Sequence, residues 1–565
     1  MKRTLSLFIV LCLLALSLSF AGAEGNAMTP GTYYGVGNGR NGAIVVAVTV
    51  SENAIENVQV VASQETWNTG SVPVKEYPAL IVENQSLNVD IVSGATISSV
   101  AMLNAVRDCI SQAGGDPAQF NTRVEPEIPF GDCEADVVVI GAGGAGMTAA
   151  CKAAQAGKSV ILLEKLDILG GTSNYSIEGF GAVEDKTHLG LGSDTTGDML
   201  AENLTAGNPN GTAAAFDVLA HNNGAAADWL RSIGAELTVA GGQTSAASSR
   251  EVGELGVTIV TALIAECKKA GVDIRTASPA TGLVMEDGAI AGVKVSVPQG
   301  EYTIKAGAVV LATGGFGANN EMVASYVPYL EGYKNSCTVG ATGDGQKMAE
   351  AVGAQLGNMD YIRVNFTYTT REDGYYYYMG CLFNTGAIFV NDEGKRFVND
   401  QGAYGVGHKV VEQGGSGWAI FDNSIATGVA DVRHYGDLGL YVCAPTIEEL
   451  AEQIGVDAQA LSETVEAYKG YVAAGKDEEF GRGMLNMTFD EAPFYACRMT
   501  CRVQGTFGGI TTNEKAEVLT ETGESIPGLY AAGECANDGT WGANPAAVNI
   551  VFGTIAAQNA VEYLG

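Results

Sequence analysis

The stretch DIVSGATISS, from Asp90 to Ser99, holds hydroxyl side chains in a setting that could serve a covalent attachment. It contains no histidine or cysteine, and its only charged residue is Asp90. Ser93 and Gly94 are ordinary turn residues, so one interpretation is a plain turn that continues through Ala95. The other interpretation is that Thr96 is itself an attachment point. The stretch alone leaves both interpretations open.

A second group of residues has the spacing of a dinucleotide-binding turn. Gly141, Gly143 and Gly146 follow an apolar strand directly and open a helix, and Glu164 ends the next strand. Such glycines let the backbone approach a pyrophosphate at the positive end of the helix. Glu164 is expected to accept hydrogen bonds from ribose hydroxyls. The strand-turn-helix-strand context favours this over a simple glycine-rich turn.

Four further stretches favour FAD over NAD as the dinucleotide. They are GGTSNYS (170–176), LATGGFG (311–317), TGDG (342–345) and IPGLYAAGE (526–534). Their wide separation along the chain is how one elongated cofactor is held. The cofactor contacts predicted beside the glycine turn and Glu164 are Lys165, Gly171, Thr172, Ser173, Ser176, Thr313, Gly314, Glu534, Asn549 and Ile550.

This FAD set resembles the soluble fumarate reductase family, which is related to succinate dehydrogenase flavoproteins and 3-ketosteroid dehydrogenases. The resemblance runs from about Ala135 to the C-terminus and implies a cap domain that interrupts the FAD domain. The Asp90–Thr96 stretch in turn resembles the D-x-x-(S/T)-G-A-T flavinylation motif of small FMN-binding domains. That resemblance implies FMN joined to Thr96 through a phosphoester, placed there by a flavin transferase. FAD is expected to be bound without a covalent bond.

The elements that must position these residues are readable from the sequence. A β-branched run at Gly42–Val50 predicts a buried strand, and apolar residues at helical spacing from Ser98 predict a helix. The fold class is predicted as α/β multidomain: a small α+β FMN-binding domain, then a Rossmann-like FAD-binding domain interrupted by an α+β cap. The predicted boundaries are a signal peptide (1–23), the FMN-binding domain (29–115), a linker (116–133), the first part of the FAD-binding domain (134–360), the cap (361–504) and the second part (505–565).

The resemblance fails where fumarate reductases bind two carboxylates. The position of their acid arginine is Tyr404, and their two histidine positions are Asn365 and Gly505. Their second arginine corresponds to Pro545, and GCLFNTG (380–386) lacks the glutamate and arginine of their proton route. A dicarboxylate would lack partners in such a pocket. Three other arginines could rebuild a clamp from new positions: Arg363, Arg371 and Arg502.

Tyr404 is the predicted catalytic acid. The 3-ketosteroid dehydrogenases carry a tyrosine in the similar segment, and a tyrosine can donate a proton beside a flavin. A packing tyrosine is the alternative, since the chain has 22. The predicted substrate pocket also includes Thr506 and Trp541, and YYYYM (375–379) is either a pocket wall or a surface strand.

These residues predict an exported ene reductase that passes electrons from FMN through FAD to an activated C=C bond. The substrate is expected to be a non-dicarboxylate, an enone or aromatic alkene, in anaerobic respiration. The alternatives are a ketosteroid-type dehydrogenase and an electron-transfer or redox-sensing flavoprotein without alkene turnover. The predicted partners are a small-molecule alkene, a flavin transferase and a membrane or extracytoplasmic electron donor.

Composition limits the other partners. Lys2 and Arg3 precede an apolar run that ends in Ala21-Gly22-Ala23, which predicts a secretory signal and a secreted protein. The net charge of -33 disfavours nucleic acid. The four histidines have no metal-ligand spacing, so no metal site is expected. The 11 cysteines show no disulfide framework, although export would permit one.

Overall fold

The computed structural model describes residues 27–65, 69–92, 95–124, 128–176, 180–184, 195–208, 211–240, 243–246, 254–371, 374, 376–383, 385–400, 406–540 and 543–565. The predicted signal segment lies outside these residues, as do Ser93, Gly94, Tyr404 and Trp541. The chain divides into two compact units, Met1–Glu127 and Ile128–Gly565. No helix in the described ranges has the length and apolar character that a membrane span requires.

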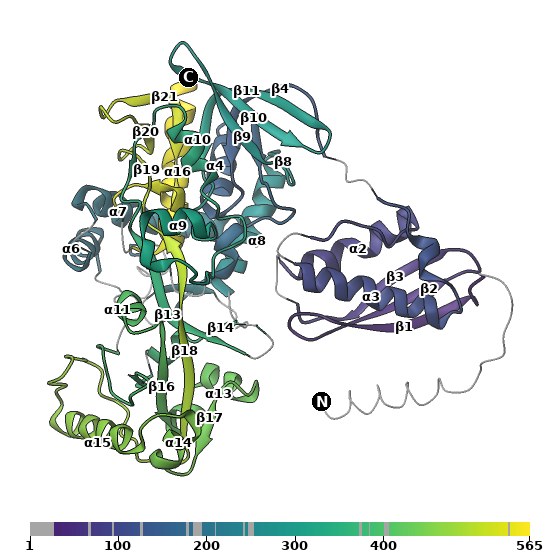
Figure 1. Ribbon diagram of the computed structural model, residues 1–565. Coiled ribbons are helices and arrows are strands. Elements are labelled where there is room, and N and C mark those ends of the chain that lie inside the picture. Colours follow the sequence, from purple (N-terminus) through teal and green to yellow (C-terminus); the bar gives the residue numbers. More distant parts are fainter. Residues whose placement is uncertain are drawn as a thin grey trace. The chain divides into compact units, whose positions relative to one another are not determined.

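The first unit is an antiparallel sheet with two long helices (Figure 1). Its strands lie in the order β1 (Gly31–Asn38), β2 (Ala43–Val50), β3 (Ile55–Ala62). The helices are α2 (Ser71–Asn84) and α3 (Thr96–Gln112), with a short 3₁₀ turn, η1, at Pro117–Phe120. Helix α3 packs against β1 and β2, and its buried face includes Met102, Val106 and Ile110. It begins two residues earlier than the sequence pattern predicted.

Two glycines of β1 allow helix α3 to lie directly on the sheet. A Cβ atom on Gly35 would overlap the carbonyl oxygen of Ala105, and one on Gly37 would overlap that of Ala101. Because the obstacles are helix backbone, no side-chain rotation can relieve them.

We expect Gly37→Ala to destabilise the first unit by about 1–3 kcal/mol, because β1 and α3 must separate to admit the methyl group. Urea unfolding of the full chain, followed by FMN fluorescence, measures this. Gly31→Ala is the matched control, since its Cβ atom would meet only the Tyr33 side chain at 3.5 Å. Equal midpoints for the two variants would contradict the packing argument.

The chain leaves the first unit later than the linker prediction of 116–133 placed it. Phe120 is 4% exposed, and its carbonyl accepts a 2.7 Å hydrogen bond from the Leu87 amide. The Val124 amide still donates to the Asn88 carbonyl at 3.0 Å. In the second unit, Phe130 already packs edge-to-face on Tyr302. Residues 116–124 of the predicted linker are thus partly packed on the first unit, because the Phe120 ring is buried there.

The second unit is built on an eight-stranded sheet with the order β20-β21-β11-β4-β5-β8, extended by a β9-β10 hairpin on β11. The strands β21, β11, β4, β5 and β8 are parallel. Their bounds are β4 (Cys133–Ile140), β5 (Val160–Leu163), β8 (Asp273–Arg275), β9 (Ala280–Glu286), β10 (Ala289–Val297), β11 (Gly300–Leu311), β20 (Glu517–Leu519) and β21 (Ser525–Ala531).

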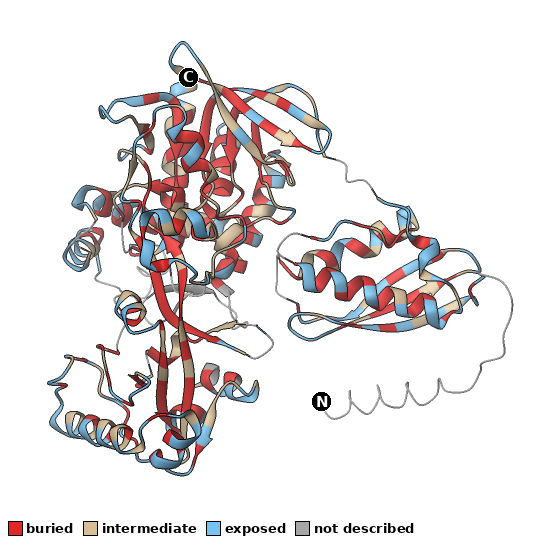
Figure 2. Ribbon diagram, viewed as in Figure 1, coloured by how far each residue is buried: buried red, intermediate tan, exposed pale blue. Residues whose placement is uncertain are grey.

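Helices cover one face of this sheet and form its main core with it, as the buried ribbons of Figure 2 show. They are α4 (Gly144–Gln155), α7 (Ala213–Ser232), α8 (Glu254–Lys269) and α16 (Pro545–Leu564). The remaining elements before β13 or after β18 are η2 (Gly171–Tyr175), α6 (Gly197–Gly207), β6 (Leu237–Ala240), β7 (Gln243–Ala246), α9 (Asn320–Tyr326), η3 (Pro328–Leu330), α10 (Asp344–Glu350), β12 (Leu356–Gly357), β19 (Gly509–Thr511), η6 (Gly533–Cys535) and β22 (Ala536–Asn537).

A second sheet, with its own core, is centred on two long antiparallel strands, β13 (Ile362–Thr370) and β18 (Phe494–Thr506). These two strands, the β13–β18 ribbon, run side by side in Figure 1. The sheet order is β14-β13-β18-β16-β15, with β17 also on β18. The other elements are β14 (Tyr376–Tyr378), η4 (Gly380–Phe383), β15 (Ile388–Val390), α11 (Gly407–Glu412), β16 (Ser416–Asp422), α12 (Asn423–Gly428), α13 (Ala430–Asp437), β17 (Val442–Ala444), α14 (Ile447–Ile454) and α15 (Ala458–Ala474).

Candidate active site

The turn between β4 and α4 has the shape that a pyrophosphate site requires. Gly141 has φ +101°, a left-handed value that favours glycine. A Cβ atom on Gly146 would overlap the Gly141 carbonyl oxygen, so the helix can start this close to the strand only with glycine. Gly143 has free space beside its Cα atom: a Cβ atom built there would have the Gly170 carbonyl oxygen, at 3.9 Å, as its nearest neighbour. The backbone at Gly143 is therefore accessible to a ligand at the N-terminus of α4.

Glu164 fixes this turn to the end of β5. It is 8% exposed, and its carboxylate accepts hydrogen bonds from the amides of Ala142 (3.0 Å) and Leu166 (2.9 Å). Burial raises the pKa of Glu164, and these two amides oppose the rise. Carboxylate oxygens have further acceptor sites, which ribose hydroxyls can use. Lys165 behaves differently, since its Nζ lies 2.5 Å from Asp344 Oδ2 and so joins β5 to α10.

Ser173 links three parts of the predicted FAD site. Its Oγ accepts from the Gly144 amide (3.1 Å) at the start of α4 and from Asn549 Nδ2 (3.3 Å) on α16. Gly171 before it has φ +50°, and Ser176 follows the η2 turn with its amide on the Ser173 carbonyl. The neighbouring predicted contacts are Thr172, which is half-buried, and Ile550, which is 1% exposed.

Buried polar atoms without partners mark where the cofactor fits. Thr313 Oγ1 and Gln346 Oε1 have no hydrogen-bond partner, while Gln346 Nε2 donates to the Gly314 carbonyl at 3.2 Å. Gly314 has φ +72°. Since buried polar groups are nearly always satisfied, these atoms are suited to a polar ligand. The residues present therefore fit FAD.

Glu534 lies where the FAD cradle meets the predicted substrate pocket. Its Oε1 accepts from the Thr506 amide at 2.9 Å, and Thr506 Oγ1 accepts from the Phe316 amide at 3.3 Å. Burial raises the pKa of Glu534, whereas the Thr506 hydrogen bond and the positive charge of Arg363 lower it. The carboxylate is thus enclosed, with hydrogen-bonding capacity left for a hydroxyl-rich chain such as ribityl.

The structure brings two of the three substituted pocket positions onto the β13–β18 ribbon. Gly505 faces Arg363 across the strands, and its Cβ position is 3.1 Å from Glu534 Oε1. Asn365 is fully buried, and its Nδ2 donates to Gln504 Oε1 at 2.9 Å. Pro545 instead occupies the first turn of α16, where its fixed φ suits a helix start. A basic side chain is absent at all three positions.

Tyr404 and Trp541 lie outside the described residues, so the predicted acid is not placed. The segment before Tyr404 is held by a buried ion network that joins Arg396 to Asp400 (2.9 Å) and to Asp477 (2.8 Å). Arg482 also lies 3.1 Å from Asp400. Burial opposes ionisation of Asp477, but hydrogen bonds from Arg396 and from backbone amides outweigh it and lower its pKa to about 2.

We expect Arg396→Met to destabilise the cap by about 3–5 kcal/mol, because two buried carboxylates lose their shared cation. The pKa of Asp477 is lower in the folded protein than its value of about 3.9 in the unfolded chain, so its ionised form stabilises the fold at pH values above about 3.9. This stabilisation is lost as the pH falls through about 2. The Tm of the wild type should therefore fall between pH 4 and 2 more steeply than that of the variant. Circular dichroism measures both, with Arg498→Met, which removes an exposed pair with Asp392, as the control. A variant with wild-type Tm at pH 7 would refute the role of the network.

In the first unit, Thr96 is the exposed first residue of α3. The N-cap residue of α3 is Ala95, which has no side chain that could cap the helix. The N-terminus of a helix stabilises a phosphate through its free amides and its dipole. Asp90 forms an exposed 3.0 Å ion pair with Arg123, and its carbonyl accepts from the Tyr77 hydroxyl at 2.7 Å. The site suits a phosphate group on Thr96.

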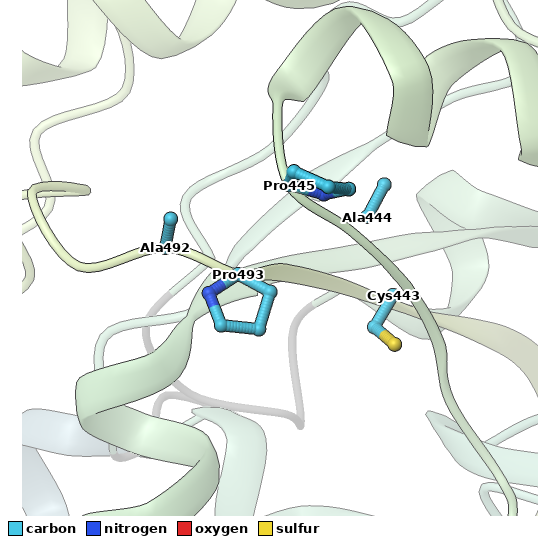
Figure 3. Close-up of a pocket in the computed structure, with 5 residues that line it drawn as sticks. All are labelled: Cys443, Ala444, Pro445, Ala492 and Pro493. Carbon is cyan, nitrogen blue, oxygen red and sulfur yellow. The ribbon is translucent and has the colours of Figure 1, made fainter.

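Two other features of the second unit do not form a functional site. Asp198, Asp217 and His221 are exposed and have ligand atoms within 4.8 Å of one another, an arrangement common without an ion, so no metal is assigned. The hollow in Figure 3 is lined by Cys443, Ala444, Pro445, Ala492 and Pro493. Apart from the exposed cysteine these are small apolar residues, so the hollow has no acid, base or charged side chain for catalysis. The ten described cysteines are free thiols.

The fold and the site together define a flavoprotein with one FMN-binding and one FAD-binding module. The FMN-binding domain model matches residues 39–111, and the FAD binding domain model matches residues 136–551. Because the latter match covers most of the chain, the protein belongs to the FAD binding domain family.

Comparison with known proteins shows which flavoenzymes this chain is similar to. The chain is 34% identical to urocanate reductase of Eggerthella lenta, over 96% of this chain and 94% of that protein. An open flavocytochrome c3 fumarate reductase structure matches with 32% identity and TM-score 0.65, over 76% of this chain and 78% of that one. A 3-ketosteroid Δ4-(5α)-dehydrogenase of Rhodococcus jostii matches with 25% identity and TM-score 0.63, over 77% and 98%. The predicted family, fold class and enzyme class, an FAD-dependent oxidoreductase acting on C=C bonds, are confirmed.

Proposed function

We propose that this protein is an exported reductase that saturates an activated C=C bond in a substrate other than a dicarboxylate. The observation that carries the proposal is the set Asn365, Gly505 and Pro545, where the fumarate reductase pattern calls for basic side chains. The similarity to urocanate and fumarate reductases supports the reaction type. The leader sequence supports export, and an extracytoplasmic donor in anaerobic respiration follows from it by analogy.

Each part of the chain has a defined task in this reaction. When bound, FAD would supply the hydride chemistry of the site, and Thr96 would hold the FMN through which electrons reach FAD. Glu534, Ser173 and Glu164 hold the dinucleotide, and the narrow turn at Gly141–Gly146 receives its pyrophosphate. Tyr404 delivers a proton from its hydroxyl to the α-carbon of the substrate. The cap encloses the substrate, and exclusion of water strengthens these polar interactions.

The experiment is anaerobic oxidation of a reduced viologen by the flavinylated protein. The acceptors are a neutral enone, an aryl-alkenoic acid and fumarate. We expect turnover of the enone or the aryl acid, but not of fumarate. Turnover of fumarate would refute the argument from the three substituted positions. If the protein reduced none of the alkenes but oxidised a saturated cyclic ketone, its function would be that of a dehydrogenase and not of a reductase.

Tyr404→Phe should lower kcat about 100-fold or more, because removal of a general acid typically costs that much. Flavin content should stay unchanged. Tyr563→Phe, at an exposed position near the end of α16, is the matched control and should keep wild-type rates. A Tyr404→Phe enzyme with full activity would exclude this tyrosine as the acid.

A further inference from the structure

One buried arginine differs from the others in its surroundings. Four arginines of the described chain are less than one-tenth exposed, namely Arg275, Arg396, Arg482 and Arg502. The first three lie within 3.1 Å of a carboxylate oxygen. For Arg502, within the same ranges, the only acceptors and rings in contact are neutral. A buried cation without a counter-ion is costly, so this position favours an anion beyond those that the described residues supply.

The neutral contacts of Arg502 satisfy only part of its guanidinium. One terminal nitrogen donates to the Asn335 carbonyl and the other to Thr370 Oγ1, both at 3.2 Å. The guanidinium carbon lies 3.9 Å from the ring centre of Tyr376. Nε is buried and has no hydrogen-bond partner. Of the five N–H donors of arginine, at least one is therefore left for a ligand.

A second unsatisfied group lies directly across the ribbon. Asn365 and Arg502 are register partners on β13 and β18, so their side chains project from the same face. Asn365 is fully buried, and its Oδ1 has no partner. Rotating the Asn365 and Gln504 amides together keeps their mutual bond and presents an Asn365 N–H instead, because amide orientation is assigned and not observed. Two adjacent orphan groups on one face indicate a bound polar ligand.

That face is also the face of the predicted pocket. Arg363 and Asn365 are two residues apart on β13, and Gly505 is the partner of Arg363. The opposite face, which includes Val364 and Val503, is packed into the core of the cap. A ligand held at Asn365 and Arg502 would thus extend along the ribbon toward Gly505 and Glu534.

We propose that Asn365 and Arg502 together bind the carboxylate of the substrate, which is accordingly a monocarboxylic alkene acid. This inference rests on the proposed function and names its substrate class. A guanidinium edge and an amide N–H match a planar carboxylate. A second carboxylate finds no basic side chain at Gly505 or Pro545. The site therefore distinguishes alkenoic acids with one carboxylate from fumarate and from neutral alkenes.

The test compares an acid with its uncharged isostere, 3-phenylpropenoate with 3-phenylpropenamide, in the wild type and in Arg502→Gln. We expect the wild type to prefer the acid. Arg502→Gln should raise the KM for the acid about 30-fold or more and leave the KM for the amide within about twofold, since only the acid loses a buried charge partner. Arg498→Gln, also on β18 but half exposed and paired with Asp392, is the matched control and should change neither.

A binding readout keeps this test separate from the reductase proposal. The oxidised holoenzyme is titrated with the saturated acid 3-phenylpropanoate while the flavin spectrum is recorded. A spectral change in the wild type that Arg502→Gln abolishes supports the carboxylate site even if no alkene is reduced. In the kinetic test, an equal rise in KM for the acid and the amide in Arg502→Gln would show that Arg502 is structural. In the binding test, a wild type that binds neither 3-phenylpropanoate nor 3-phenylpropenoate at 10 mM would overturn the inference.

Discussion

Thr96→Ala is expected to yield a protein that retains FAD and carries no covalent FMN. A phosphoester requires the threonine hydroxyl, and alanine has none. When the wild type is produced with a flavin transferase, its mass should increase by that of FMN less one water. The variant should show no such increase, and denatured protein should lack flavin fluorescence on a gel. Viologen-driven reduction at FAD can survive, while turnover with the natural donor should stop.

Two controls locate the effect. Thr96→Ser keeps a hydroxyl at the start of α3 and should accept FMN at least in part. Thr122→Ala removes an exposed threonine of the same unit that lies outside the motif, and should be fully flavinylated. Covalent FMN on Thr96→Ala would show that another residue is the anchor and that the plain-turn interpretation of Ser93-Gly94 was correct.

Gly146→Ala should lose at least about nine-tenths of its FAD, because overpacking against rigid backbone displaces the turn that must lie against the pyrophosphate. The added methyl group would overlap the Gly141 carbonyl oxygen, so the strand end and the helix start would move apart. FAD content is measured as flavin absorbance per protein after gel filtration. Covalent FMN, measured separately after denaturation, should be unchanged.

Gly207→Ala provides the comparison. Its Cβ position in α6 has no atom within 4 Å, so the same chemical change should leave FAD content at the wild-type level. FAD retention by Gly146→Ala would mean that this turn does not contact the cofactor as closely as the glycine spacing indicates.

The glycine turn could be predicted from sequence because its requirements are local. Gly141 and Gly146 touch each other, and the strand and helix on either side are evident from hydrophobic spacing. The family and the α/β fold class followed from such local motifs and are confirmed. The flavin attachment at Thr96 and the acid role of Tyr404 remain predictions.

The rest depends on contacts between residues far apart in the chain. Lys165, a predicted cofactor contact, places its Nζ against Asp344, 179 residues later. The Asn365 amide donates its hydrogen bond to Gln504, 139 residues away. Arg396 meets Asp477 across 81 residues. No spacing rule encodes such pairs, because they arise only when β13, β18 and the helices of the cap are packed together. The burial of Phe120 escaped prediction for the same reason.

The short connector between the two units has a consequence for electron supply. The chain is anchored to the first unit at Val124 and to the second at Phe130, and six residues can span at most about 20 Å. A tether of this length keeps the FMN module at a high effective concentration, of millimolar order, relative to the FAD module. In the proposed function, passage of electrons between them would thus be a first-order process. Its rate per molecule should stay constant on dilution, so a dilute sample should be as active, molecule for molecule, as a concentrated one.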